Sequence, residues 1–223
     1  MTVTIEMVSD LVCPWCWLGL RRLKAARDLV PEVDVQILFR PYELDPTIPK
    51  GGTDYKAYMK QKFGSDTGKE RSNAMRDALI QYGQEEGIPF AFDKITWRPN
   101  SFDAHRLVGW AQGQDLGMAT KEALFQAFFA NGEDIGNLET LISIASRVGL
   151  DPNIVSDLLA SDADVERTRE EQEMFRQMGI AGVPTYIADR TIAVQGAESA
   201  EKLARFLKTA AARQPQERPL ATS

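Results

Sequence analysis

The sequence predicts an α/β fold in which an N-terminal βαβ unit and a C-terminal ββα unit flank a long block of helices. Three observations support this prediction. Apolar and polar residues alternate near both ends of the chain, as they do in half-buried strands. Helical spacing fills the segment between Gly51 and Gly179. A Cys-x-x-Cys motif stands where the first strand gives way to the first helix.

The composition is that of an ordinary globular protein. The chain has 223 residues, 43% of them hydrophobic, and a formal net charge of −6. It is long enough for one large domain, or for a domain with an insertion. No segment approaches the roughly 18 apolar residues of a membrane span. The acidic balance disfavours nucleic acid as a partner, and the N-terminus does not resemble a signal peptide. We therefore expect a cytoplasmic protein with neither membrane nor nucleic acid as a partner.

The βαβ unit begins with a strand over 2–7, where Val3, Ile5 and Met7 alternate with polar residues. The motif follows directly, and helical spacing from 18 to 30 predicts that it opens a helix. Pro14 suits the first turn, where its missing N–H would have no partner within the helix. Alternation resumes over 33–39. The two strands should be parallel, because a helical crossover joins them.

Between 51 and 178 the pattern indicates helices and no convincing strand. We expect helices near 53–63, 68–86, 101–115, 118–130, 138–148, 152–160 and 162–177. Strand signals return at 184–188 and 191–194, with a polar turn between them, and a last helix is expected over 199–213.

These elements predict a thioredoxin-like fold with a large all-helical insertion between its two halves. Residues 1–50 and 179–213 would form the discontinuous thioredoxin-like domain, 51–178 the insertion domain, and 214–223 a flexible tail. The insertion can wall one side of a groove above the start of the first helix.

Cys13-Pro14-Trp15-Cys16 carries the predicted chemistry. Cysteines at positions i and i+3 of a helix start can form a disulfide with little movement. The first sulfur faces unpaired N–H groups and the positive end of the helix dipole, which favour a thiolate. Cys13 is thus the expected nucleophile, and Cys16 can resolve a mixed disulfide. Pro14 stiffens the turn, and Trp15 offers an aromatic face to a substrate.

Two other interpretations of the cysteine pair are weaker. A zinc site needs four ligands, and beyond the two cysteines the chain offers only His105, so we expect no metal site. A metal or cluster shared across a dimer would need ligands from both chains. A purely structural disulfide would close a very short loop, which stabilises little.

Four separated motifs resemble the FrnE-like branch of the DsbA-family oxidoreductases, in the expected order and over residues 3–208. They are Ser9-Asp10-x-x-Cys13-Pro14-Trp15-Cys16, Pro41-Tyr42-Glu43-Leu44, Pro99-Asn100-Ser101-Phe102-Asp103-Ala104-His105-Arg106 and Gly182-Val183-Pro184. Sequence alone would leave Pro184 an ordinary trans turn proline.

The resemblance implies a thiol–disulfide oxidoreductase with Cys13 as nucleophile and Cys16 as resolving thiol. It also implies a cis peptide bond at Pro184, in a loop where the backbone of Val183 pairs with an extended substrate. No bound cofactor is expected beyond the redox-active Cys13–Cys16 disulfide, with glutathione as one conceivable redox partner. Substrates would be cysteine-containing proteins or small thiols. Because the motif carries Pro-Trp where strongly oxidising relatives carry Pro-His, a very low thiol pKa is not implied.

Three further residues are candidates for supporting roles. His105 is the only histidine, and its apolar neighbours favour a packed or hydrogen-bonded role over proton transfer. Glu6 and Asp10 are close to the cysteines in sequence, so either carboxylate could move protons or could simply be solvated.

Two other function classes stay open. The kappa-type glutathione transferases and 2-hydroxychromene-2-carboxylate isomerases share the inserted fold and use glutathione with a serine near the position of Cys13. The retained cysteine pair argues against that activity. A non-enzymatic binding module would tolerate replacement of Cys13. The sequence leaves substrate, redox direction and the choice between monomer and homodimer undecided.

Overall fold

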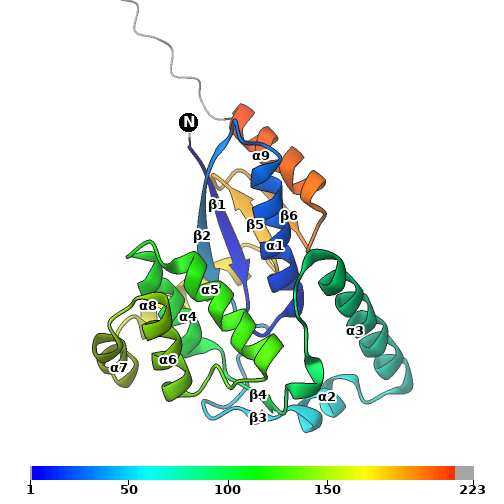
Figure 1. Cartoon of the computed structure of the whole chain (residues 1–223), viewed down its shortest axis with the longest axis vertical. Helices are drawn as coiled ribbons and strands as arrows, with labels where there is room; N and C mark the ends of the chain where they lie inside the picture. The colour runs from blue at the N-terminus through cyan, green and yellow to red at the C-terminus, as the bar shows by residue number, and fades with distance from the viewer. Residues whose placement is uncertain (1, 214–223) are drawn as a thin grey trace, which may run out of the picture.

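The computed structural model describes residues 2–213 and has the expected α/β architecture (Figure 1). The flexible tail predicted for 214–223 lies outside the described residues. Within 2–213, no helix combines the length and the apolar character needed to cross a membrane.

One four-stranded mixed sheet forms the centre of the thioredoxin-like half. Its strand order is β2-β1-β5-β6. The strands are β1 (Thr2–Ser9), β2 (Asp34–Pro41), β5 (Thr185–Ala188) and β6 (Ile192–Gln195). β1 is parallel to β2 and antiparallel to β5. The predicted βαβ and ββα units are therefore confirmed, with α1 (Pro14–Asp28) as the crossover and α9 (Ala200–Arg213) as the last helix.

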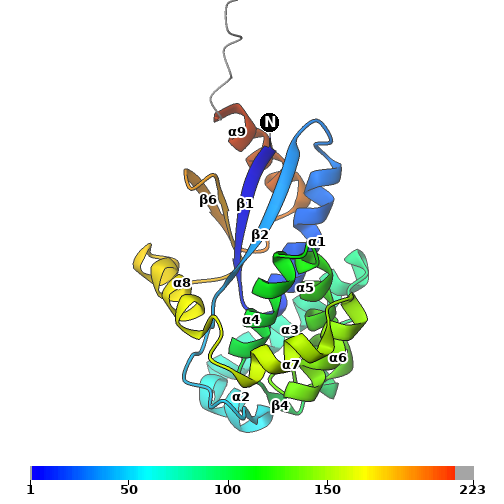
Figure 2. The ribbon, with the colours of Figure 1, turned by 90° about the vertical axis from the view of Figure 1, so that its left-hand side faces the viewer.

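The two faces of the sheet are covered by different helices (Figure 2). Ile5 and Met7 of β1 belong to the main core together with buried residues of α1 and α9. Val8 points to the other face, where it packs in a smaller cluster with Phe175 of α8 (Val165–Gln177). This separation follows from the period of two in a strand, which sends successive side chains to opposite faces.

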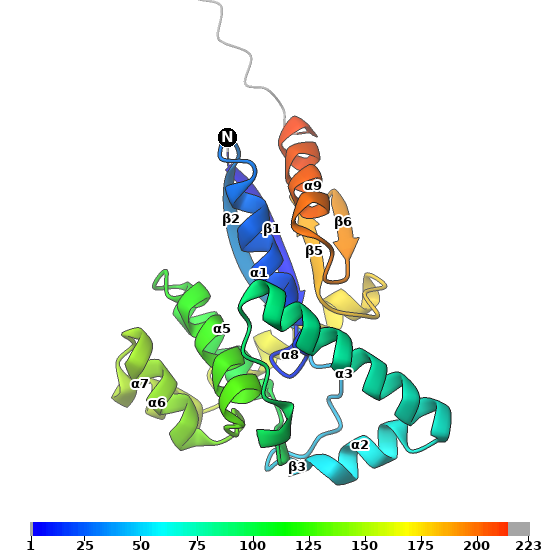
Figure 3. The ribbon, with the colours of Figure 1, turned by 45° about the vertical axis from the view of Figure 1, so that its right-hand side comes forward.

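The insertion places helices on two sides of the start of α1 (Figure 3). α2 (Tyr55–Phe63) and α3 (Asp66–Glu86) lie on one side. On the other are α4 (Phe102–Gln112), α5 (Gly117–Gln126), α6 (Leu138–Val148) and α7 (Pro152–Ala160). The main apolar cluster runs without a break from β1 and α1 into α4, α5 and α6. The division of the chain into two domains stays a prediction.

Two details of the insertion differ from the sequence prediction. β3 (Thr53–Asp54) and β4 (Trp97–Arg98) form a small antiparallel sheet where no strand was expected, because two-residue strands are too short to show a period. The helix expected over 118–130 changes to a π-helical turn at Ala127–Asn131. Phe128 and Phe129 of this turn are both buried.

Candidate active site

Cys13 stands at the N-terminus of α1, as the sequence predicted. It is the N-cap residue, and Pro14 occupies the first helical position. The N–H of Cys13 donates to the carbonyl oxygen of Asp10 at 3.2 Å, and the N–H of Cys16 donates to the carbonyl oxygen of Cys13 at 2.9 Å. These bonds form the tight turn that carries the chain from β1 into the helix. Both cysteines are free thiols in this structure.

The loop before β5 lies against Cys13. The Sγ atom of Cys13 is 3.8 Å from the carbonyl oxygen of Val183, and the Val183–Pro184 peptide bond is cis, as the family resemblance implied. Gly19 of α1 makes this approach feasible. A Cβ atom at Gly19 would lie 2.8 Å from Cγ of Pro184 and closer still to the hydroxyl of Tyr186. The two sequence-distant motifs therefore meet at Cys13.

Cys16 is in a different environment from Cys13. It is fully buried, whereas Cys13 keeps 5% of its surface exposed at the end of the helix. Burial raises the pKa of the Cys16 thiol well above its ordinary value, and the contact with Cys13 raises it further. Cys16 therefore stays a thiol at neutral pH, which suits a residue that acts second.

Lys121 of α5 is a buried cation beside the pair, and the sequence analysis did not single it out. Its side chain is fully buried, and its Nζ atom has no hydrogen-bond partner among the described residues. Nζ lies 5.3 Å from the ring centre of Phe39 and 5.6 Å from that of Phe125. Burial lowers the pKa of Lys121 to about 8, although Cys16, Asp10 and Cys13 oppose this shift in their ionised forms.

A sequence signal for Lys121 did exist. The buried residues of α5 are Gly117, Thr120, Lys121, Leu124 and Phe125. They repeat with the three- and four-residue spacing of a helix face that packs on a core. A lysine within such a stripe is unusual, because a buried ammonium group is costly unless it has a partner.

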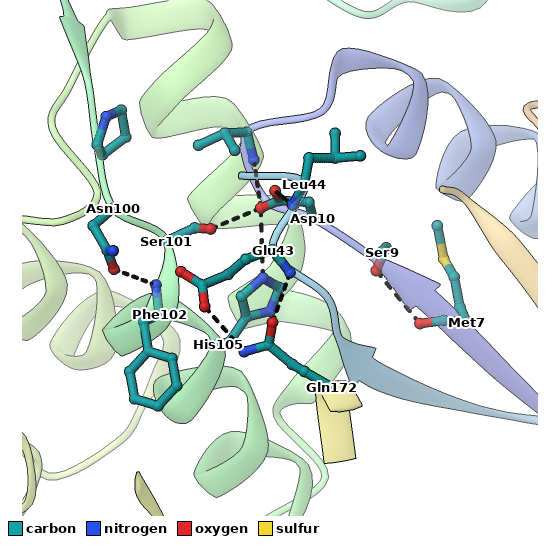
Figure 4. Close-up of polar contacts among 12 residues, drawn as sticks. Met7, Ser9, Asp10, Glu43, Leu44, Asn100, Ser101, Phe102, His105 and Gln172 are labelled. Atoms are coloured by element: carbon teal, nitrogen blue, oxygen red, sulfur yellow. Dashed lines mark hydrogen bonds and ion pairs between the residues drawn. The ribbon is translucent and has the colours of Figure 1, made fainter. Parts of the chain in front are cut away.

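Asp10 links the first of the family motifs to two others (Figure 4). Its carboxylate accepts hydrogen bonds from Ser101 Oγ at 2.8 Å and from the N–H of Leu44 at 2.8 Å. His105 Nε2 lies 3.5 Å from the same carboxylate. Residues more than 90 positions from Asp10 thus hold the loop that carries Cys13.

The ionisation of this cluster is set by burial and by its own contacts. Burial opposes the charge on Asp10, but His105, Arg98 and the N–H of Leu44 outweigh it and lower the pKa of Asp10 to about 2. Burial lowers the pKa of His105 in spite of the attraction of Asp10. At neutral pH the pair is therefore a carboxylate beside a neutral imidazole. A supporting role for His105 stays a prediction.

The carboxylates of Glu6 and Asp10 are both buried, so the alternative that either is simply solvated is wrong. Asp10 is fully buried and Glu6 keeps 4% of its surface exposed. Glu6 also lies away from the cysteines, because it follows Ile5 in β1 and so points to the opposite face of the sheet. There its carboxylate binds Arg40 at 2.6 Å and Arg190 at 3.5 Å. We assign Glu6 no part in the site.

A groove opens beside Cys13, with a volume of about 430 Å³. Pro14 and Trp15 line it at the start of α1, and residues of α2, α3, β4 and the π-helical turn of the insertion line its other sides. Trp15 also contacts Tyr82 of α3 edge-to-face, with 6.4 Å between ring centres. The sequence predicted a groove with one side walled by the insertion, but not which residues line it.

One protein-family model matches nearly the whole chain, including every residue of this site. Residues 4–208 match the model of the DSBA-like thioredoxin domain. The protein YwbO of Bacillus subtilis is 28% identical over 200 residues, which cover 86% of this chain and 90% of that protein. A 2-hydroxychromene-2-carboxylate isomerase of Sphingobium xenophagum is 24% identical over 195 residues, with 86% and 92% covered.

A solved structure is similar over nearly the full chain. It is a probable DsbA oxidoreductase from Streptomyces coelicolor, with a TM-score of 0.87 and 28% sequence identity. The match covers 98% of this chain and 94% of that one. The helical insertion is therefore shared with that structure as well as the sheet.

Proposed function

Because this chain belongs to the DSBA-like thioredoxin-domain family, we propose that it is a thiol–disulfide oxidoreductase that cycles Cys13 and Cys16 between a dithiol and a disulfide. The observation that carries the proposal is the position of Cys13. It caps the N-terminus of α1, and its sulfur lies 3.8 Å from the carbonyl oxygen of Val183 in the loop of Pro184. The resemblance to the FrnE-like branch supports the same activity.

Cys13 begins the proposed reaction. Its sulfur is at the end of a helix, where free N–H groups and the helix dipole favour negative charge. The thiolate attacks one sulfur of a substrate disulfide and forms a mixed disulfide, while the other substrate sulfur leaves as a thiolate. The backbone of Val183 would pair with an extended substrate next to the reacting sulfur.

Cys16 completes the cycle. It loses its proton and attacks Cys13, so that the Cys13–Cys16 disulfide forms and the second substrate thiol is released. Its burial and raised pKa keep it protonated before the mixed disulfide exists. The reverse sequence oxidises a substrate dithiol. Which direction operates depends on the reduction potential of the pair and of its partner, for which glutathione or a cysteine-containing protein is proposed. The cytoplasmic location stays a prediction.

The first experiment separates the two cysteines. The Cys16→Ser variant should retain nucleophilic attack and accumulate a mixed disulfide with glutathione, visible by mass spectrometry of the intact protein. Cys13→Ser should form none, because Cys16 is buried. The wild type should reach a reversible equilibrium with glutathione buffers. If the wild type forms no disulfide at any glutathione ratio, the oxidoreductase proposal is wrong.

A second candidate function is glutathione-dependent isomerisation. The sequence similarity to a 2-hydroxychromene-2-carboxylate isomerase favours it. The cysteine pair argues against it, because an isomerase that only binds glutathione has no use for a resolving thiol. Assay of 2-hydroxychromene-2-carboxylate with glutathione decides the matter. Turnover that survives in Cys16→Ser without any mixed disulfide would favour the isomerase.

A further inference from the structure

The groove beside Cys13 is positively charged within an acidic protein. Its charged lining residues are Lys56, Lys62, Arg76 and Arg98, and no Asp or Glu within residues 2–213 lines it. The chain as a whole has a formal net charge of −6. A concave surface with one sign of charge and low-dielectric walls concentrates its field on a ligand of the opposite sign.

Arg98 is the most buried of these four cations. Only 5% of its surface is exposed, although arginine is rarely buried without a partner. Its Nη1 atom donates to the carbonyl oxygen of Pro99 at 2.9 Å, and its guanidinium lies 5.1 Å from the ring centre of Tyr58. No carboxylate of residues 2–213 forms an ion pair with it within 4.0 Å. The buried carboxylates of Asp10 and Glu43 feel its charge only at longer range.

The other cations lie at the rim. Lys56 and Lys62 of α2 are exposed. Arg76 of α3 forms an ion pair with Asp93 at 2.5 Å, and the side chain of Asp93 is 92% exposed. Solvent screens such a pair strongly. The guanidinium of Arg98 is therefore the cation of the groove that would attract an anionic ligand most strongly.

Most of the remaining lining is apolar, with Ser72 and Asn73 as polar exceptions, and the groove has the size of a small-molecule site. Met59, Phe63, Met75 and Leu79 line the groove together with aromatic rings. Its volume of about 430 Å³ falls in the range of about 300–1,000 Å³ typical of small-molecule sites. Methionine side chains adapt to irregular apolar shapes. The groove thus combines an apolar body with a single deep anion position.

We propose that this groove binds a small disulfide or thiol that carries a carboxylate next to an apolar or aromatic body, with Arg98 holding the carboxylate while Cys13 reacts with the sulfur. This inference rests on the proposed oxidoreductase function and names its substrate class. Arginine suits the role, because its planar donors match a carboxylate in two-point geometry.

The reaction at this site balances without a further reactant. The reduced enzyme and a disulfide RSSR give a mixed disulfide between Cys13 and one RS group, and the other RS group leaves with the proton of Cys13. Cys16 then displaces the second RS group, which leaves with the proton of Cys16. The substrate is reduced to two thiols, and the cysteine pair is oxidised to a disulfide.

The test compares disulfide probes that differ in charge. The reduced wild type is mixed with 5,5′-dithiobis(2-nitrobenzoate), which is aromatic and anionic, with 4,4′-dithiodipyridine, which is aromatic and neutral, and with cystamine, which is cationic. Each rate is divided by the rate of a free thiol with the same probe, which removes differences in intrinsic reactivity. We expect the corrected rate for the anionic probe to exceed that for the neutral probe at least tenfold, and to fall as salt is added.

Variants assign the preference to Arg98. In Arg98→Met the ratio of anionic to neutral rates should fall close to one, and Arg98→Lys should retain part of it. Lys208→Met on α9 is the control, because Lys208 pairs with Glu32 on the surface and is absent from the groove. Should Arg98→Met fail to fold, the double variant Lys56→Gln/Lys62→Gln changes only exposed residues and should weaken the salt dependence.

The outcomes distinguish this inference from the function on which it rests. Fast reaction and a reversible disulfide with no charge preference would overturn the anion site and leave the oxidoreductase intact. That result would also be expected of an enzyme restricted to protein substrates. Reaction no faster than a free thiol with every probe, and no disulfide, would overturn both. An unchanged ratio in folded Arg98→Met would refute the role of Arg98.

Discussion

Single residues decide how the two thiols differ. Cys13 and Cys16 are three positions apart, yet one caps a helix beside a groove and the other is sealed in the core. The difference comes from neighbours that the motif itself does not contain. Val183 faces the first sulfur, and the charge of Lys121 acts on the second. The proposed nucleophile and the proposed resolving thiol thus differ in their surroundings.

Lys121 should lower stability and assist the resolving step. Its charge favours the thiolate that Cys16 must form, although burial opposes that charge. In Lys121→Met the release of the second thiol should slow about tenfold at pH 7, and its pH midpoint should rise by about one unit. Stopped-flow release of thionitrobenzoate resolves this second phase from the first, which reports on Cys13. An unchanged second phase in the folded variant would contradict the assignment.

The same variant should unfold less easily, and the size of this effect depends on pH. Burial lowers the pKa of Lys121 from its ordinary value of 10.5 to about 8. The folded protein therefore holds this proton less tightly than the unfolded chain, so the free-energy cost is fully present below about pH 8 and vanishes above 10.5. Lys121→Met should raise the free energy of unfolding by roughly 3 kcal/mol at pH 7. Urea denaturation at pH 7 and 10 measures it, with Lys60→Met, at an exposed position of α2, as the control.

At the scale of elements, the close approach of α1 to β5 sets the position of the Pro184 loop. Gly19 is the point of contact, because any Cβ there would overlap both Pro184 and Tyr186. Gly109 of α4 is a helical glycine with open space around it. The two glycines form a matched pair that separates helix propensity from packing.

Gly19→Ala and Gly109→Ala should therefore change stability in opposite directions. Alanine at position 109 should stabilise the protein by about 0.5–1 kcal/mol, because alanine has a higher helix propensity than glycine. Alanine at position 19 should destabilise it by about 1–3 kcal/mol, because the side chain enters an occupied space. Urea denaturation measures both, and the reaction of Cys13 with disulfides should slow only in Gly19→Ala. Equal stabilisation by both substitutions would show that Pro184 and Tyr186 can move away from position 19 at little cost in free energy.

The small sheet of β3 and β4 is the element that the sequence did not reveal. It joins the start of α2 to the segment before α4, and it brings Arg98 to the groove. The pairing Thr53 with Arg98 and Asp54 with Trp97 involves two residues on each strand. Such a pairing depends on backbone geometry created by the surrounding helices and leaves no alternation in the sequence.

At the scale of the whole molecule, Asp10 couples the thioredoxin-like half to the insertion. Its hydrogen bonds reach Leu44 after β2 and Ser101 before α4. The site and the overall stability should therefore respond together when this carboxylate loses its charge.

Acid should weaken the fold through Asp10. Its pKa is lowered from 3.8 to about 2, so the stability it contributes is present above pH 3.8 and is lost as the pH falls towards 2. Asp10→Asn should lower the free energy of unfolding by roughly 2 kcal/mol at pH 6, with the difference shrinking towards pH 2. Urea denaturation across this range measures the effect. Asp93→Asn, at an exposed side chain, is the control, and equal effects of the two would contradict the coupling.

The sequence by itself predicted most of the secondary structure and the cysteine pair for which we propose the reaction. Strand alternation, helical spacing and the Cys-x-x-Cys motif are local patterns, and they predicted the sheet, most helix bounds and the cysteine pair. Tertiary structure alone decided which side chains surround the pair. It placed Glu6 on the opposite face, buried Lys121 beside the thiols and set Arg98 in the groove. The physical reason is that burial and charge at a site depend on segments that are close in space and distant in sequence, and no local pattern records them.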